Sequence, residues 1–198
     1  MTRVQEGATI GNRVSILRMS QEDMIKEILE LENGGEKCGN GNGSNTLNAK
    51  INQAIVAQKK AQDISKDYGG KSVASDGEIN TLSGWGKYKD PNNIINRSVA
   101  PQDVIAKSKE IGHELQQNSF LDNINRGGEP GQSKASHAEK QLSLISTKPI
   151  GVAPIDMCDD CIIFFSKLSV YEKRTIIVAD PSTVRIFESD GSVREIKR

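Results

Sequence analysis

Residues 136–161 read SHAEKQLSLISTKPIGVAPIDMCDDC, and the pattern of this segment indicates the fold class. Its apolar spacing predicts a helix over 135–146, a buried strand over 148–154 and a further helix from Cys158 to Tyr171. A strand set between two helices is typical of an α/β domain, in which helices cover a central sheet. The same stretch holds one of the two histidines and two of the three cysteines in the chain.

Three strands are predicted downstream of this stretch: TIIVAD at 175–180, TVRIFES at 183–189 and SVREIK at 192–197. The link between the first two is only a few residues long. A parallel pair would need a crossover of about a dozen residues or more. We therefore expect these two strands to form an antiparallel hairpin.

Upstream, two short strands are predicted near 71–74 and 78–82, on either side of Asp76-Gly77, a dipeptide that favours a type I′ hairpin. A helix is expected to begin at Pro101 and to run to about Leu115.

Two further helices are predicted near the N-terminus, over Ser20–Asn33 and Thr46–Tyr68. We therefore divide the chain into an N-terminal helical segment, 1–69, and a domain over 70–198 that carries the stretch quoted above.

Composition narrows the classes of function. Lys+Arg and Asp+Glu both count 26, so the whole chain has no net charge and no strong electrostatic footprint for nucleic acid. No apolar run is long enough for a membrane span, and the first twenty residues lack the apolar region of a signal peptide. Three cysteines form no disulfide framework, which favours reduced thiols or metal ligands.

His137, Cys158 and Cys161 form a candidate metal site. One imidazole and two thiolates suit Zn²⁺, and three protein ligands leave the fourth position open, as in catalytic zinc sites. Glu139 lies two residues from His137, where it can accept a proton from a zinc-bound water without occupying the metal. A structural site would need a fourth ligand, for which Cys38 and His113 are the candidates.

The pattern His137-x-Glu139 followed by Cys158-x-x-Cys161 resembles the signature of the zinc-dependent nucleobase deaminases. Met157 stands where that signature usually has proline. The wider sequence, over about residues 110–195, resembles the deaminase domains of bacterial polymorphic toxins. This resemblance implies a cytidine deaminase-like three-layer fold with helices on both faces of a mixed five-stranded sheet, whose fourth and fifth strands are antiparallel. Residues 70–198 would then be the deaminase domain.

The resemblance also implies a function: a hydrolase that converts cytosine to uracil in single- or double-stranded DNA, with Glu139 as the proton shuttle. Trp85, in a loop with Lys87, Tyr88 and Lys89, is a candidate stacking residue for nucleic acid. Ser136 is expected near the mouth of the site, and Asn80 near the sugar of the substrate, by loose resemblance to other deaminases.

Lys140 and Gln141 are interpreted as surface positions. A toxin of this kind would act in the cytoplasm of a target cell after secretion and would have a cognate immunity protein as partner. Two alternatives remain open: a deaminase of free nucleosides or of RNA, and a non-catalytic binding module stabilised by zinc. Glu139 argues against the last, because a structural zinc site has no use for it.

Overall fold

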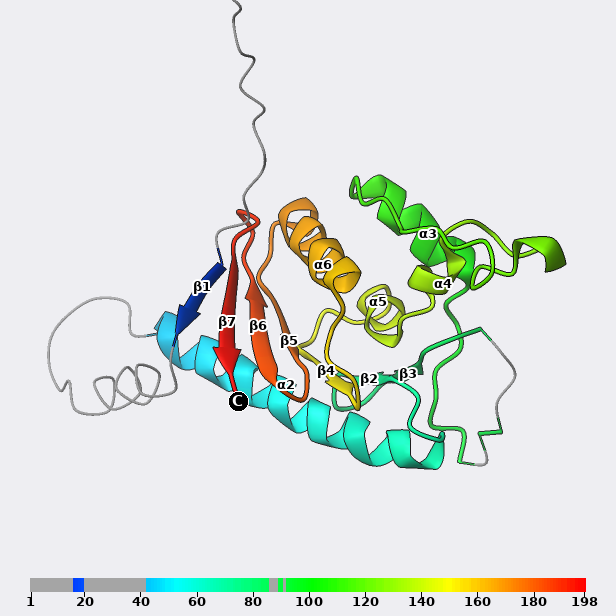
Figure 1. The fold of residues 1–198 in the computed structure, drawn as a ribbon. Helices are drawn as coiled ribbons and strands as arrows, with labels where there is room; N and C mark the ends of the chain where they lie inside the picture. The colour runs from blue at the N-terminus through cyan, green and yellow to red at the C-terminus, as the bar shows by residue number, and fades with distance from the viewer. Residues whose placement is uncertain (1–15, 20–41, 86–88, 91) are drawn as a thin grey trace, which may run out of the picture.

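The structure is a computed structural model that describes residues 16–19, 42–85, 89–90 and 92–198 (Figure 1). The predicted helix over Ser20–Asn33 lies outside these residues, as do Cys38, Lys87 and Tyr88. None of the described helices combines the length and the hydrophobicity needed to cross a bilayer.

A mixed sheet of seven strands forms the centre of the molecule, in the order β1-β7-β6-β5-β4-β2-β3. The pairs β1–β7 and β4–β5 are parallel, and the other pairs are antiparallel. The strands are β1 Ile16–Met19, β2 Val73–Ser75, β3 Asn80–Leu82, β4 Ile150–Ala153, β5 Ile176–Ala179, β6 Thr183–Phe187 and β7 Val193–Lys197.

The predicted α/β three-layer class is confirmed, and so is the antiparallel pairing of the fourth and fifth predicted strands, β5 and β6. The expected number of five strands is wrong. SVREIK pairs with β6 as β7, and β1 then adds to the outer edge of β7, so the sheet is wider than the resemblance implied.

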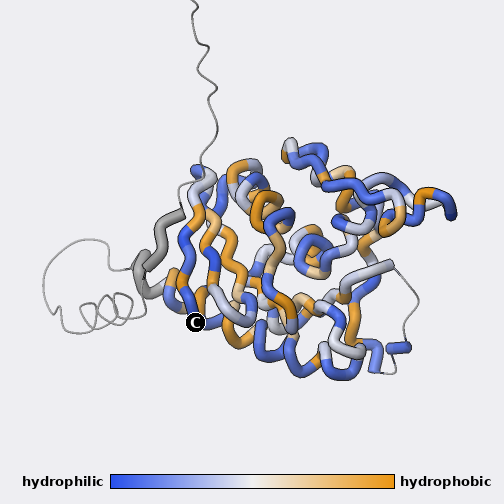
Figure 2. Tube along the Cα trace, viewed as in Figure 1, coloured by the Kyte–Doolittle hydropathy of each residue, from blue (hydrophilic) through white to orange (hydrophobic). Residues whose placement is uncertain are grey.

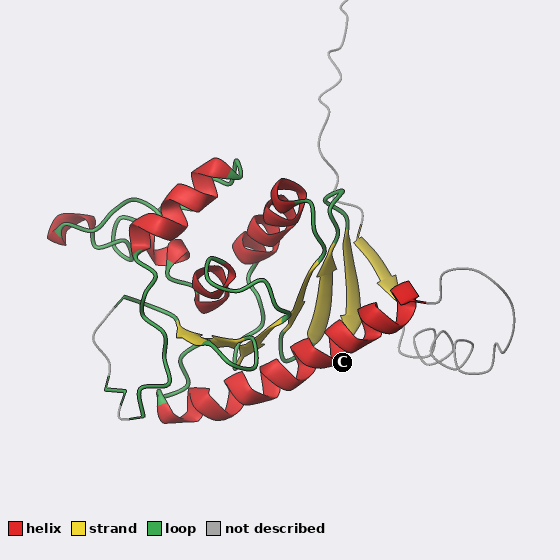
Figure 3. Cartoon of the chain, turned by 180° about the vertical axis from the view of Figure 1, so that it is seen from behind, coloured by secondary structure: helices red, strands yellow, loops and turns green. Residues whose placement is uncertain are grey.

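Helices cover both faces of the sheet (Figures 1 and 3). The long helix α2 lies along one face, and the remaining helices lie on the other. The helices are α2 Asn42–Asp67, α3 Pro101–Glu110, α4 Gln132–Ala135, α5 Ala138–Ser143 and α6 Asp159–Glu172, with a short 3-10 helix η1 at Ile124–Arg126.

The core has a separate hydrophobic layer on each side of the sheet. Phe164, Phe165 and Leu168 of α6 pack with Leu142 of α5 on one side. Apolar residues of α2, among them Ala54, Ala57 and Ala61, are buried on the other. Figure 2 shows the hydrophobic segments gathered along the central strands, between these layers. The division of the chain at residues 69 and 70 stays a prediction, and α2 packs directly on the strands that follow it.

Two predicted elements differ from the structure in detail, for local reasons. The helix that begins at Pro101 ends at Glu110, because Gly112 takes a left-handed φ of +69° and the His113 N–H donates to the Ser108 carbonyl at 2.8 Å. The hairpin between β2 and β3 is present, but only Gly77 of its central residues has a positive φ. A type I′ turn requires positive φ at both central positions, so that turn type is wrong.

The predicted helix over 135–146 is divided in two. His137 has extended backbone, with φ −64° and ψ 133°, and separates the single turn of α4 from α5. This break sets His137 at the N-cap of α5, where its side chain faces the start of α6.

Candidate active site

The three predicted ligands come from the N-terminal ends of two helices. His137 is the N-cap of α5, Cys158 is the N-cap of α6, and Cys161 lies in the first turn of α6. Nδ1 of His137 lies 3.1 Å from Sγ of Cys161 and 3.5 Å from Sγ of Cys158. The ligand atoms of all three residues lie within 4.8 Å of one another, so the fold brings the predicted ligand set together.

The chemistry of this set fits zinc. Both cysteines are free thiols, and one nitrogen with two sulfur donors is a combination that zinc binds tetrahedrally. Among the described residues, no other group of three His, Cys, Asp or Glu side chains is close enough to hold a metal. His113 is not a fourth ligand, because its Nε2 faces the carboxylate of Asp160 at 3.3 Å.

The three side chains differ in how readily they lose a proton. The hydrogen bond with Cys161 lowers the pKa of Cys158 to about 3, with a further contribution from His137. Burial raises the pKa of Cys161 well above its usual value. Burial would lower the pKa of His137, but the hydrogen bond with Cys158 and the charge of Glu139 outweigh it and raise that pKa. Cys158 is therefore ready to bind a cation, and metal binding must displace protons from the other two residues.

A cavity of about 420 Å³ opens onto two of the three ligands, His137 and Cys158. His137, Glu139 and Cys158 line it together, and Glu139 is only 3% exposed. Glu139 lies in the first turn of α5, two residues after His137, so its carboxylate shares the cavity with the ligand set. A carboxylate in this position can exchange protons with a water or substrate held beside the metal site.

The three predicted substrate residues lie in different surroundings. Ser136 lines the cavity, and its hydroxyl donates to the Ser133 carbonyl at 2.6 Å. Trp85 does not line it: Nε1 donates to the Gln132 carbonyl at 3.0 Å, and the ring packs on the cluster that contains Val104 and Ala135. Asn80 is buried away from the cavity lining, with Nδ2 donating to the Ile94 carbonyl at 3.1 Å.

Lys140 and Gln141 are buried, so their interpretation as surface positions is wrong. Nζ of Lys140 forms an ion pair with Asp160, donates to the Lys134 carbonyl at 3.2 Å and lies 5.4 Å from the centre of the Phe164 ring. Nε2 of Gln141 donates to the carbonyls of Leu82 and Ser136, at 3.0 and 2.8 Å. These contacts anchor α5 to its surroundings, and therefore fix His137 and Glu139.

Asp160 lies between the two cysteines in the sequence, and its carboxylate contacts Lys140 and His113. Burial would raise its pKa, but hydrogen bonds with His113 and Lys140 outweigh burial and lower the pKa well below its usual value. The carboxylate is therefore ionised and ties the first turn of α6 to α5. The unusual pair of acids in CDDC was the only sign of this role in the sequence, and nothing in the sequence pointed to Lys140 as the partner.

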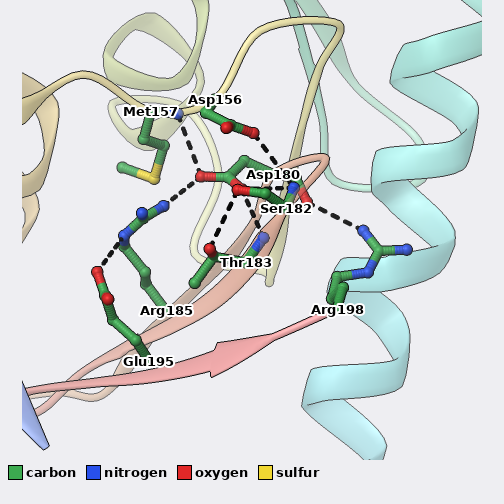
Figure 4. Close-up of polar contacts among 8 residues, drawn as sticks. All are labelled: Asp156, Met157, Asp180, Ser182, Thr183, Arg185, Glu195 and Arg198. Carbon is green, nitrogen blue, oxygen red and sulfur yellow. Dashed lines mark hydrogen bonds and ion pairs between the residues drawn. The ribbon is translucent and has the colours of Figure 1, made fainter. Parts of the chain in front are cut away.

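A second buried carboxylate supports the loop before Cys158 (Figure 4). Asp180 follows β5, and one of its oxygens accepts the N–H of Met157 at 3.1 Å and pairs with Arg185. The other oxygen accepts the N–H of Thr183 at 2.8 Å. Asp180 therefore joins the β5–β6 turn to the residue that precedes the first cysteine ligand.

Residues 80–143 match a family described as single-strand DNA deaminase toxin A, C-terminal. The matched segment contains His137 and Glu139 and ends before the two cysteines. No curated protein matches the chain. The predicted resemblance to bacterial toxin deaminase domains is confirmed.

Proposed function

We propose that this protein is a zinc-dependent hydrolytic deaminase that converts cytosine to uracil in DNA and acts as a toxin. The observation that carries the proposal is the convergence of the His137, Cys158 and Cys161 ligand atoms, beside a cavity that His137, Cys158 and Glu139 line. The match of residues 80–143 to a family named for single-strand DNA deamination supports both the reaction and the polymer.

In this proposal, His137, Cys158 and Cys161 hold the metal and Glu139 moves the protons. When bound, zinc supplies Lewis-acid chemistry that makes water a nucleophile near neutral pH. Glu139 takes one proton from the attacking water and delivers it to ring nitrogen N3, while the water oxygen bonds to C4. Glu139 then carries the second proton to the amino group, the C4–N bond breaks, and ammonia leaves with uracil as the other product.

The cavity lining includes four serines, Ser72, Ser83, Ser133 and Ser136, whose hydroxyls can hydrogen-bond to a polar substrate. Ser136 is the proposed substrate contact, since it lines the cavity together with His137 and Glu139. We propose that Trp85 acts on the substrate indirectly, because its Nε1 donates to the carbonyl of Gln132, the residue before the cavity-lining Ser133. The contact of Asn80 with the sugar of the substrate stays a prediction. As a toxin, the protein would act in the cytoplasm of a target cell after secretion, where a cognate immunity protein would protect the producer.

The test is incubation of the protein with single-stranded DNA, double-stranded DNA, RNA and free cytidine, followed by measurement of uracil or uridine. We expect product from single-stranded DNA, and none from the Glu139→Gln variant with zinc still bound. Product from free cytidine alone would favour the nucleoside deaminase instead.

Metal analysis of the same preparations separates the third alternative. A zinc-stabilised binding module would contain zinc and form no product from any of the four substrates. The Cys158→Ala variant is expected to lose zinc and activity together, and full activity without zinc would contradict the proposed chemistry.

A further inference from the structure

Three apolar side chains are exposed together on the segment between α3 and α4. Phe120 is 86% exposed, Leu121 55% and Ile124 38%. They belong to residues 118–127, called here the Phe120 loop, which projects from the molecule beside α3 and α4 (Figures 1 and 3). Single exposed apolar residues are common, but a group of this kind indicates a binding surface.

The Phe120 loop is held in one conformation by its own polar contacts. The carboxylate of Asp122 is fully buried and accepts the N–H groups of Asn118, Gly131 and Ser133 at 2.8 to 2.9 Å. The side chain of Asn118 accepts the N–H groups of Phe120 and Leu121. The exposed ring is therefore presented by a fixed backbone, which reduces the ordering cost of binding.

The surface of this loop has the chemistry of a nucleotide site. A hollow of about 420 Å³ is lined by Ser119, Phe120, Leu121, Asn123, Asn125 and Arg126. The lining offers one aromatic face, two amides and one cation, and includes no acid. Within the described residues the Arg126 side chain forms no ion pair, and the one acid of the loop, Asp122, is buried and fully bonded.

One hydrogen bond links the Phe120 loop to the wall of the proposed active site. Asp122 binds the backbone N–H of Ser133, and Ser133 lines the catalytic cavity together with Ser136 and Glu139. The two hollows have no lining residue in common, so a ligand that reaches both must be longer than one that fills either. Among macromolecules, a single-stranded nucleic acid fits an exposed ring beside an unpaired arginine, because any base can stack and every linkage carries a phosphate.

We propose that the Phe120 loop is a second nucleotide subsite, on which a base flanking the target cytosine stacks against Phe120 while Arg126 contacts a backbone phosphate. The subsite rests on the proposed function, since it names how that site holds a polymer. Its occupant is a segment of single-stranded DNA.

The test is the binding of a fluorescently labelled 12-nucleotide single-stranded DNA with one cytosine, measured by anisotropy with the full chain. Phe120→Ala is expected to raise Kd about tenfold, and Phe120→Trp to restore binding. Arg126→Gln is expected to reduce the slope of log K against log salt by about 0.7. The control is Val56→Ala, which removes an exposed apolar side chain from α2 and should leave Kd unchanged.

Unchanged affinity and salt slope in both loop variants would overturn the subsite and leave the loop as a surface for a protein partner. The affinity for cytidine monophosphate is a second measurement. Phe120→Ala should leave that affinity unchanged. An equal loss of affinity for the monophosphate and the oligonucleotide would show that the substitution acts through the catalytic cavity instead. The anisotropy assay measures binding without turnover, so the two proposals can fail separately. If the deaminase proposal is wrong and the subsite is right, wild-type protein will form no uracil but will still bind the oligonucleotide through Phe120.

Discussion

The substitution Lys140→Met tests whether the buried ion pair behind the active site holds α5 in place. Nζ of Lys140 has no exposure and pairs with Asp160, which is 10% exposed. Methionine keeps an unbranched side chain and removes the charge, so Asp160 would keep His113, at 3.3 Å, as its one remaining side-chain partner among the described residues. The variant therefore leaves an ionised carboxylate buried without its main partner.

Removing one member of a buried pair costs about 3–5 kcal/mol. We expect the lower end, about 3 kcal/mol, because the His113 ring remains beside Asp160, with Nε2 at 3.3 Å from the carboxylate. With a urea dependence of about 2 kcal/mol per molar, the midpoint of unfolding should fall by about 1.5 M. Zinc content should fall as well, because Lys140 follows Glu139 and Asp160 precedes Cys161.

The measurement is urea unfolding followed by circular dichroism, with wild type and variants compared at one pH. The double variant Lys140→Met/Asp160→Asn removes both charges and is expected to recover at least half of the lost stability. Lys66→Met is the matched control: its pair with Asp63 is exposed, and such pairs contribute about 0–1 kcal/mol. A midpoint within 0.3 M of wild type for Lys140→Met, or a double variant no more stable than the single one, would refute the reasoning.

Three further predictions concern packing, pH and metal. Gly151→Ala should destabilise the protein by about 3 kcal/mol or more in urea unfolding, because a Cβ there would lie 1.9 Å from the Gln58 backbone nitrogen and push α2 off β4; wild-type stability would contradict this packing. Burial would raise the pKa of Asp122, but hydrogen bonds from backbone N–H groups outweigh burial and lower the pKa. The ionised carboxylate therefore stabilises the folded protein above the ordinary Asp pKa, and this stabilisation is lost as pH falls through the lowered pKa. Asp122→Ala should therefore lower the unfolding midpoint at pH 7 by more than at pH 3. An equal decrease of the midpoint at the two pH values would show that the stabilisation does not come from the ionised carboxylate. Removal of metal with a chelator should lower the Tm in differential scanning fluorimetry, and an unchanged Tm would argue against a bound metal.

The order of elements and the ligand set were predictable from the sequence because both depend on local spacing. Cys158-x-x-Cys161 occupies one helical turn, and His137-x-Glu139 needs only the start of another helix. The short link after β5 fixed the antiparallel pairing of β5 with β6. By contrast, β1 and β7 pair in parallel although they are near opposite ends of the sequence. The apolar pattern of neither strand indicates which strand it pairs with.

The burial of Lys140 and Gln141 could not be predicted, because it depends on elements distant in the sequence. In a helix on the surface of a domain, polar residues mark the solvent face. Helix α5 has no such face: all six of its residues are buried, between the sheet and the helices around it. Its polar side chains therefore point at partners that only the tertiary fold brings near, such as Asp160 and the Leu82 carbonyl.

The buried polar contacts behind the ligands predict how the site would lose zinc. Each helix start that carries a ligand is held from behind by a buried polar contact, α5 by Lys140 and the segment before α6 by Asp180. These supports fix the directions of His137 and Cys158 more directly than they fix the hydrophobic layers, which are built from other residues. Conservative changes at the supports, such as Asp180→Asn, should therefore weaken zinc retention under mild chelation before they cause unfolding. The ligands could be found from spacing alone, but their alignment depends on charges that the fold hides from solvent.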